Sequence, residues 1–252
     1  MQHFYVWNFR KKRRYIYTVL VALLIALFLF FEPSRLFFLF AKDQQTALTK
    51  GNVKENNIAL TFNISWGEEK VYDILQVLKE QKVRATFFVS GEWAERHPQI
   101  IEKITDEQHE LGMLGYRYKS YLEQDVEQVR KDMIHAKQVF KKLGFSDMKY
   151  IRPPSGHFNK EIIMLAEQLQ LEVTHWSVNP NDWKNPGVNE IVNAVMEQTS
   201  GGDIILLHAS DSAKQTKEAL QTVIPDLQNK KFTFVTISEM LNEVSAEEKL
   251  VD

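Results

Sequence analysis

The chain has 252 residues, a formal net charge of −2 and no cysteine. The lack of cysteine excludes disulfides and thiolate metal sites, and the near-neutral charge lacks the basic excess of most nucleic-acid-binding proteins, so we expect no nucleic-acid partner. With an N-terminal segment set aside, about 200 residues remain, which is enough to bury the core of one full domain.

A basic cluster at residues 10–14 precedes a charge-free, mostly apolar run at residues 15–31, and a second short apolar run follows at residues 36–41. As a helix, the first run is about 25 Å long, close to the thickness of the hydrocarbon core. We therefore expect residues 15–41 to form a transmembrane or interfacial anchor. Because positive charge precedes it, residues 1–14 are expected in the cytoplasm and the later residues outside it. A cleaved signal peptide is the alternative, but no small-x-small motif follows the run.

Residues 42–56 are polar and lack hydrophobic periodicity, so we expect a linker there. From residue 57 to residue 245, strand-like segments alternate with helix-like segments, and residues 246–252 form a tail. Such alternation is typical of a parallel sheet wrapped by helices, and about seven strand–helix units favour a closed or nearly closed barrel. The expected strands are residues 58–64, 85–89, 110–114, 150–151, 171–176, 203–208 and 232–235, and the expected helices are residues 70–81, 98–108, 123–143, 160–169, 189–198 and 213–230, with a last helix starting near 238.

Polar side chains stand at the ends of several expected strands. Asn63 ends the first strand, and Arg152, Asp182 and His208 lie at or just after the ends of later ones. Each has an ordinary structural explanation: a satisfied core histidine, a turn-forming aspartate or a surface-loop arginine. Strand ends converge on one face of an α/β barrel, so together they predict a site. A histidine beside a carboxylate can act there as a general acid.

Four segments of the chain resemble motifs of the NodB-homology polysaccharide deacetylases, which form carbohydrate esterase family four. Their order and spacing agree with the family, and the likeness extends over roughly residues 55–245. Within the family, the chain is most similar to the membrane-anchored sporulation polysaccharide deacetylase B type. The four segments are Ala59-Leu60-Thr61-Phe62-Asn63, Arg152-Pro153-Pro154-Ser155-Gly156, Asn179-Pro180-Asn181-Asp182-Trp183 and Ile205-Leu206-Leu207-His208.

The resemblance implies a distorted (β/α) barrel and a hydrolase that removes acetyl groups from the amino sugars of peptidoglycan or a related glycan. In active members a divalent metal, usually zinc, is held by one Asp and two His and activates water. Another Asp, paired with an arginine, is the base, and a histidine beside a carboxylate protonates the leaving amine. Carried over to this chain, the catalytic positions are His208, Asp182, Arg152 and Asn63, and the substrate-binding positions are Trp183, Pro153, Pro154 and Tyr118.

The chain departs from this pattern at the base and at all three metal ligands. Asn63 occupies the base position, and an amide has no basic site near neutral pH. Ile64, Leu114 and Tyr118 occupy the ligand positions. Aliphatic side chains cannot bind zinc, and a tyrosine would have to ionise from a pKa of about 10. We therefore expect no metal cofactor and weak or absent metal-dependent deacetylation.

Three interpretations follow. The chain is an exported deacetylase acting on cell-wall or spore-cortex glycan, a non-catalytic glycan-binding pseudoenzyme, or a structural protein of the spore envelope. Trp66, Trp183 and Tyr118 lie near strand ends, where aromatic rings can stack on sugar faces, although rim packing explains each of them singly. The residue chemistry favours the second interpretation, and the family resemblance supplies the envelope setting of the first.

Overall fold

The computed structural model describes residues 17–21, 23, 46–53 and 55–248, in two compact units, residues 1–45 and 46–252. The described part of the first unit is helical. Most of the predicted anchor at residues 15–41, and all of the predicted cytoplasmic segment at residues 1–14, lie outside the described residues. Within the described part of the chain, no helix is both long enough and apolar enough to cross a bilayer.

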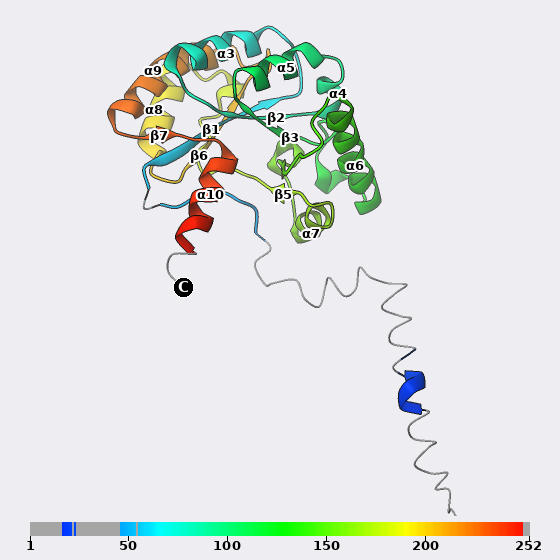
Figure 1. The fold of residues 1–252 in the computed structure, drawn as a ribbon. Helices are drawn as coiled ribbons and strands as arrows, with labels where there is room; N and C mark the ends of the chain where they lie inside the picture. The colour runs from blue at the N-terminus through cyan, green and yellow to red at the C-terminus, as the bar shows by residue number, and fades with distance from the viewer. Residues whose placement is uncertain (1–16, 22, 24–45, 54, 249–252) are drawn as a thin grey trace, which may run out of the picture. The chain divides into compact units, whose positions relative to one another are not determined.

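The second unit is built on a parallel sheet of seven strands. Strand β1 lies at its centre, between β2 and β6, and also pairs with β7 (Figure 1). The hydrogen-bonded order is β5-β4-β3-β2-β1-β6. The predicted α/β architecture with a parallel sheet is therefore confirmed. The strands are β1 (Asn57–Ile64), β2 (Thr86–Val89), β3 (Glu110–Met113), β4 (Tyr150–Ile151), β5 (Glu172–Val173), β6 (Ile204–His208) and β7 (Thr233–Phe234).

The gap between the edge strands β5 and β6 is spanned by isolated bridges rather than by a continuous ladder. Leu48 bridges Thr174 just after β5, and Val178 bridges Ile205 in β6. Among the described residues, the ring is thus closed by single residue pairs, which makes the barrel irregular. Because residues 46–53 take part in this closure, the folded unit begins before residue 57, where we expected the domain to start.

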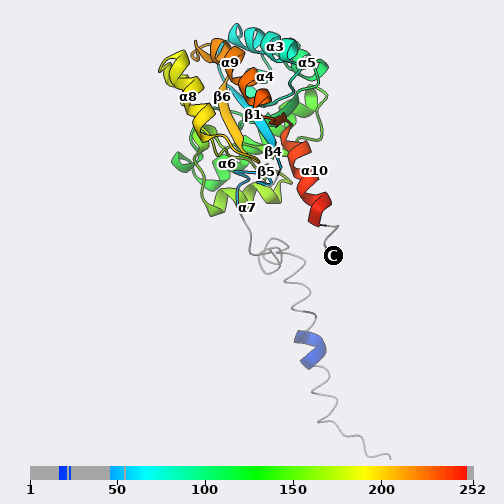
Figure 2. The ribbon, with the colours of Figure 1, turned by 90° about the vertical axis from the view of Figure 1, so that its left-hand side faces the viewer.

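Helices cover the outside of the sheet, with α3 packed against α9 and α8 against α9. Figures 1 and 2 show α10 on a different side of the sheet from α3 and α9. Helix α3 matches its prediction residue for residue. Helix α6 begins three residues later than predicted, because Asp125 caps it by accepting a hydrogen bond from the Gln128 amide. The helices are α3 (Lys70–Gln81), α4 (Gly91–Ala94), α5 (Pro98–Asp106), α6 (Val126–Lys142), α7 (Lys160–Gln168), α8 (Val188–Gln198), α9 (Thr216–Asn229) and α10 (Ile237–Glu248).

Strand β1 separates two environments because successive side chains of a strand point to opposite faces. One set packs in the large hydrophobic cluster under the helices: Ile58, Leu60, Phe62 and Ile64. The alternate set faces the interior of the ring, where Thr61 and Asn63 are buried although both are polar. A buried polar side chain needs hydrogen-bond partners. The interior at the carboxyl end of β1 is therefore a candidate site.

Candidate functional site

Arg152 is the largest fully buried side chain of the ring interior. It directly follows β4, and its backbone amide extends the sheet by donating to Met113. The guanidinium donates from Nη1 to Asn63 Oδ1 and from Nη2 to Thr61 Oγ1 and the carbonyl of His175, each at 2.9 Å. Its central carbon lies 4.0 Å from the centre of the Phe88 ring. Neutral groups thus surround this cation.

The charge of Arg152 has no carboxylate partner among the described residues. Burial lowers the pKa of Arg152 to about 9, and the Tyr118 side chain opposes this by raising it. A pKa of about 9 keeps the side chain protonated at neutral pH. Its Nε atom is buried and has no hydrogen-bond partner. A buried cation without a counter-charge is costly, so this arrangement is a feature to be explained.

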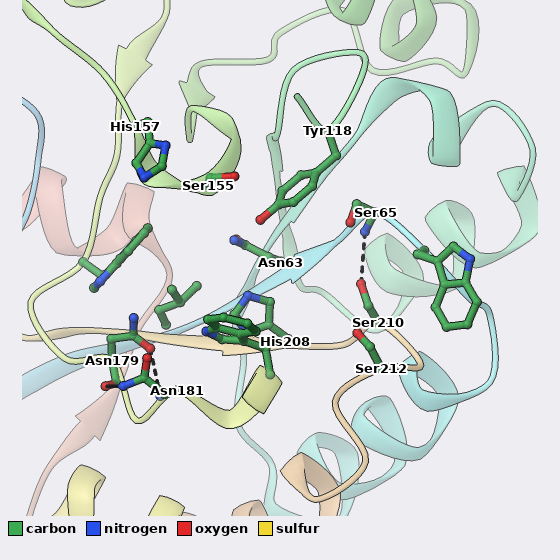
Figure 3. A pocket seen from close by; sticks show the side chains of 14 residues that line it. Asn63, Ser65, Tyr118, Ser155, His157, Asn179, Asn181, His208, Ser210 and Ser212 are labelled. Carbon is green, nitrogen blue, oxygen red and sulfur yellow. Dashed lines mark hydrogen bonds between the residues drawn. The ribbon is translucent and has the colours of Figure 1, made fainter. Parts of the chain in front are cut away.

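The amide of Asn63 is oriented by Arg152. A guanidinium has only donors, so the atom that faces it must be Oδ1, and Nδ2 must point away. Asn63 lines the pocket described below, and its nitrogen is directed toward the side where Tyr118 and Ser155 lie (Figure 3). The position at which the family resemblance expects a proton-accepting carboxylate therefore presents a hydrogen-bond donor.

Asp182 and His208 form the second polar unit of the site. Oδ1 of Asp182 accepts from Nδ1 of His208 at 2.8 Å, and Oδ2 accepts from the His208 backbone amide and from Thr216 Oγ1, both at 2.8 Å. Asp182 is fully buried, whereas His208 lines the pocket. His208 is also the register partner of Asn63 across β1 and β6. The pairing holds the ring with Nδ1 on the carboxylate and leaves Nε2 for a ligand.

A pocket of about 530 Å³ opens over these residues at the carboxyl ends of the strands. Its size is in the range of ligand-binding pockets. None of its lining residues is an Asp, Glu, Lys or Arg. The lining consists of hydroxyl, amide, imidazole and aromatic side chains and one leucine: Asn63, Ser65, Trp66, Tyr118, Ser155, His157, Trp176, Asn179, Asn181, Trp183, Leu206, His208, Ser210 and Ser212.

The loop that carries Trp66 is fixed by Asp211, which follows β6. The Asp211 carboxylate accepts hydrogen bonds from the amides of Glu68, Glu69 and Lys70 at 2.8–3.0 Å, at the start of α3. Gly67 has φ +78°, and a Cβ there would lie 2.2 Å from the Asp211 side chain. Only glycine lets the two loops approach this closely, so the strand-end loops of β1 and β6 form one rim of the pocket.

The three positions at which the resemblance places metal ligands do not come together. Ile64 is fully buried in the cluster under the helices, and Leu114 is fully buried in the interior cluster. Neither lines the pocket, whereas Tyr118 does. In the described ranges no three His, Cys, Asp or Glu side chains are grouped so that they could hold a metal ion. The residues present do not fit a zinc site.

The structure joins Asn63 to Arg152 and Asp182 to His208 by hydrogen bonds, and it sets Asn63 beside His208 across β1 and β6. Tyr118, Trp66 and Trp183 line the pocket, but Pro153 and Pro154 do not. Both prolines are buried, and the residues of the same segment that line the pocket are Ser155 and His157. Sequence reasoning missed other polar lining residues. Three of these residues follow the end of a strand within a few positions, and this position is the signal that could have identified them. They are Ser65, Ser210 and Ser212.

Comparison with known proteins supports the resemblance. Residues 50–174 match the family model described as polysaccharide deacetylase. A peptidoglycan-N-acetylglucosamine deacetylase of Bacillus cereus is 32% identical over 190 residues, which cover 74% of this chain and 89% of that protein. The uncharacterized protein YlxY of Bacillus subtilis is 27% identical over 200 residues, which are 79% of this chain. The chain spans only 62% of the length of that relative.

Among solved structures, this chain is similar to BA3943 of Bacillus anthracis, described as a CE4 family pseudoenzyme. The two share 28% sequence identity and a TM-score of 0.74, over 79% of this chain and 69% of that one.

Proposed function

The chain belongs to the polysaccharide deacetylase family, and we propose that it binds cell-wall or spore-cortex glycan in the pocket at Asn63 without metal-dependent deacetylation. One observation carries this proposal. The Asn63 amide is locked onto Arg152 through Oδ1, so a donor occupies the place where hydrolysis needs a base. Without a base or a metal to activate water, hydrolysis of an unactivated amide loses several kcal/mol of transition-state stabilisation.

The aromatic rim supports a sugar ligand. Trp66, Trp183 and Tyr118 all line the pocket and expose 64%, 49% and 44% of their surfaces. Grouped exposed rings on a concave surface mark interaction sites, and a pocket that combines them with hydroxyl and amide groups suits a polyhydroxylated ligand.

The cellular setting is a further part of the proposal. Residues 15–41 would anchor the chain in a membrane with residues 1–14 in the cytoplasm and the pocket on the outer side, as in the sporulation deacetylase B type that the chain resembles. The basic cluster before the apolar run supports this orientation. Reporter fusions on each side of the run, read for cytoplasmic or external activity, test it.

Metal retention tests the absence of a zinc centre. The purified whole chain is incubated with zinc, dialysed extensively and analysed for metal and for acetate release from N-acetylglucosamine oligomers. We expect no stoichiometric metal and no acetate. About one ion retained per chain, or acetate release that is lost in His208→Ala, would refute the non-catalytic proposal.

Retention on insoluble peptidoglycan tests binding. Trp183→Ala should reduce the retained fraction, because it removes an exposed ring from the rim. Tyr72→Ala is the matched control: Tyr72 is 42% exposed but does not line the pocket, so its loss should leave retention unchanged. If the wild-type chain is not retained on any wall polysaccharide, a structural role in the envelope replaces the binding role.

The intact Asp182–His208 pair favours a second candidate function, hydrolysis of the N-acetyl group by an altered mechanism. The geometry leaves Nε2 of His208 facing the pocket, where it can give a proton to a leaving amine. Acetate release without added metal, abolished by Asp182→Asn, would establish this candidate.

A further inference from the structure

The buried cation of this site lacks an anion, and the pocket beside it lacks any acidic side chain. None of the ion pairs among the described residues involves Arg152, and its Nε donor is unpartnered. The acid of the site, Asp182, has its oxygens occupied by His208 and Thr216. The guanidinium also cannot turn toward solvent, since Asn63, Thr61 and the His175 carbonyl hold it in place.

Asn63 connects the buried cation to the pocket, because it accepts a hydrogen bond from Arg152 and also lines the pocket. Arg152 donates to Oδ1 of the amide, which polarises the amide and makes its Nδ2 hydrogens better donors toward the pocket. His208 and Tyr118 also line the pocket, and Figure 3 shows the Tyr118 hydroxyl directed toward Asn63. A buried positive charge attracts an anion and repels an ammonium group.

We propose that the pocket selects a glycan that carries a carboxylate, with the carboxylate accepting a hydrogen bond from Asn63 Nδ2 and supplying the counter-charge that Arg152 lacks. This inference rests on the proposed function for the glycan part of the ligand. The carboxylate part rests on the Arg152–Asn63 arrangement alone, so the two can be tested separately. An acetamide would meet the same donor but would leave the cation uncompensated, and a free amino sugar would be rejected.

A matched pair of ligands tests the selection. The disaccharide of N-acetylglucosamine and N-acetylmuramic acid carries a lactyl carboxylate, and its lactyl carboxamide derivative has the same shape without the charge. Calorimetry on the whole chain should show the acid binding at least tenfold more tightly than the amide. Asn63→Asp places a carboxylate on Arg152 and should reduce this ratio to about one, whereas Trp183→Ala should weaken both ligands and keep the ratio. Equal affinities for the two ligands in the wild-type chain would overturn the inference.

A small probe separates this inference from the proposed function. Acetate and acetamide are titrated into isotopically labelled protein while the side-chain amide signal of Asn63 and the Nε signal of Arg152 are followed by NMR. We expect a saturable shift with acetate and none with acetamide, and no acetate response in Asn63→Asp. A response to acetate without any glycan binding would uphold the carboxylate site and refute the glycan proposal. Glycan binding without an acetate response would refute the carboxylate site and leave the glycan proposal standing.

Discussion

Arg152 places a full positive charge 2.9 Å from the neutral Oδ1 of Asn63, in the interior of the ring. Both side chains are buried, with Asn63 only 4% exposed. A carboxylate in place of the amide would bind the guanidinium more strongly, because both partners would then be charged. The guanidinium therefore faces a neutral amide and has no negative partner. The cost of this missing charge can be measured as a change in the free energy of unfolding.

Asn63→Asp should stabilise the protein at neutral pH, by about 1–3 kcal/mol, because it gives Arg152 a counter-charge without adding volume. The guanidinium would hold the pKa of the new carboxyl below its unfolded value of about 3.9. The added stability is therefore present above that value and is lost as the pH falls through the lower, folded-state pKa. Urea denaturation from pH 7 to pH 3 measures it, with Asn63→Ala as the control that removes the acceptor. A variant less stable than the parent at pH 7 would contradict our account of the buried cation.

His109 predicts a pH dependence in a separate part of the fold. It is 6% exposed, and burial lowers its pKa to about 4, partly opposed by Glu107. The unfolded chain, with a histidine pKa of about 6.5, takes up this proton first as the pH falls. The free energy of unfolding should thus decrease between pH 6.5 and pH 4, with a contribution on the order of 3 kcal/mol from this residue. Urea denaturation across that window measures the decrease.

His109→Asn is the control, because an amide oxygen can replace Nδ1 as the acceptor for the Ala85 amide. The variant should show a smaller decrease over the same window. It should not become flat, because burial also lowers the pKa of His175. An unchanged slope would show that His109 is not the titrating group.

Asp182 should be the most sensitive of the site residues to truncation. Asp182→Ala removes the acceptor for three hydrogen bonds and leaves the His208 amide buried without a partner, so we expect a loss of about 3 kcal/mol. Thr216→Val removes only one of these bonds and should cost about 1 kcal/mol. Guanidinium denaturation of both variants gives the comparison. Equal losses would mean that the His208 contacts contribute little to the fold.

Asp211→Ala should loosen the rim at Trp66. It removes the acceptor for three amides at the start of α3, which we expect to cost about 1–2 kcal/mol and to weaken glycan retention in the same variant. Asp147→Ala is the matched control, because Asp147 is exposed and makes one contact of 3.4 Å with Lys149. It should change stability by less than about 0.5 kcal/mol. Loss of stability with full glycan retention would show that the Asp211 contacts do not position the rim.

The sequence by itself determined the α/β class, the order of the elements and the strand-end positions of the main site residues. These follow from local patterns: hydrophobic period two or 3.6, and a change to polar residues where a strand leaves the core. Asn63, Arg152 and His208 could be found in this way because each lies at or just after a strand, whereas Asp182 lies in a 3-10 turn well after β5. The substitution of the base at Asn63 was equally plain, since it depends only on side-chain chemistry.

Tertiary structure alone decided how these residues face one another. The register that sets Asn63 opposite His208 depends on the pairing of β1 with β6, which lie more than 130 residues apart, and no local pattern encodes it. The pairing of residues 46–53 with the ring and the burial of Arg152 without a carboxylate likewise arise from long-range packing. Local sequence sets which elements form, whereas side-chain partners depend on which distant elements become neighbours.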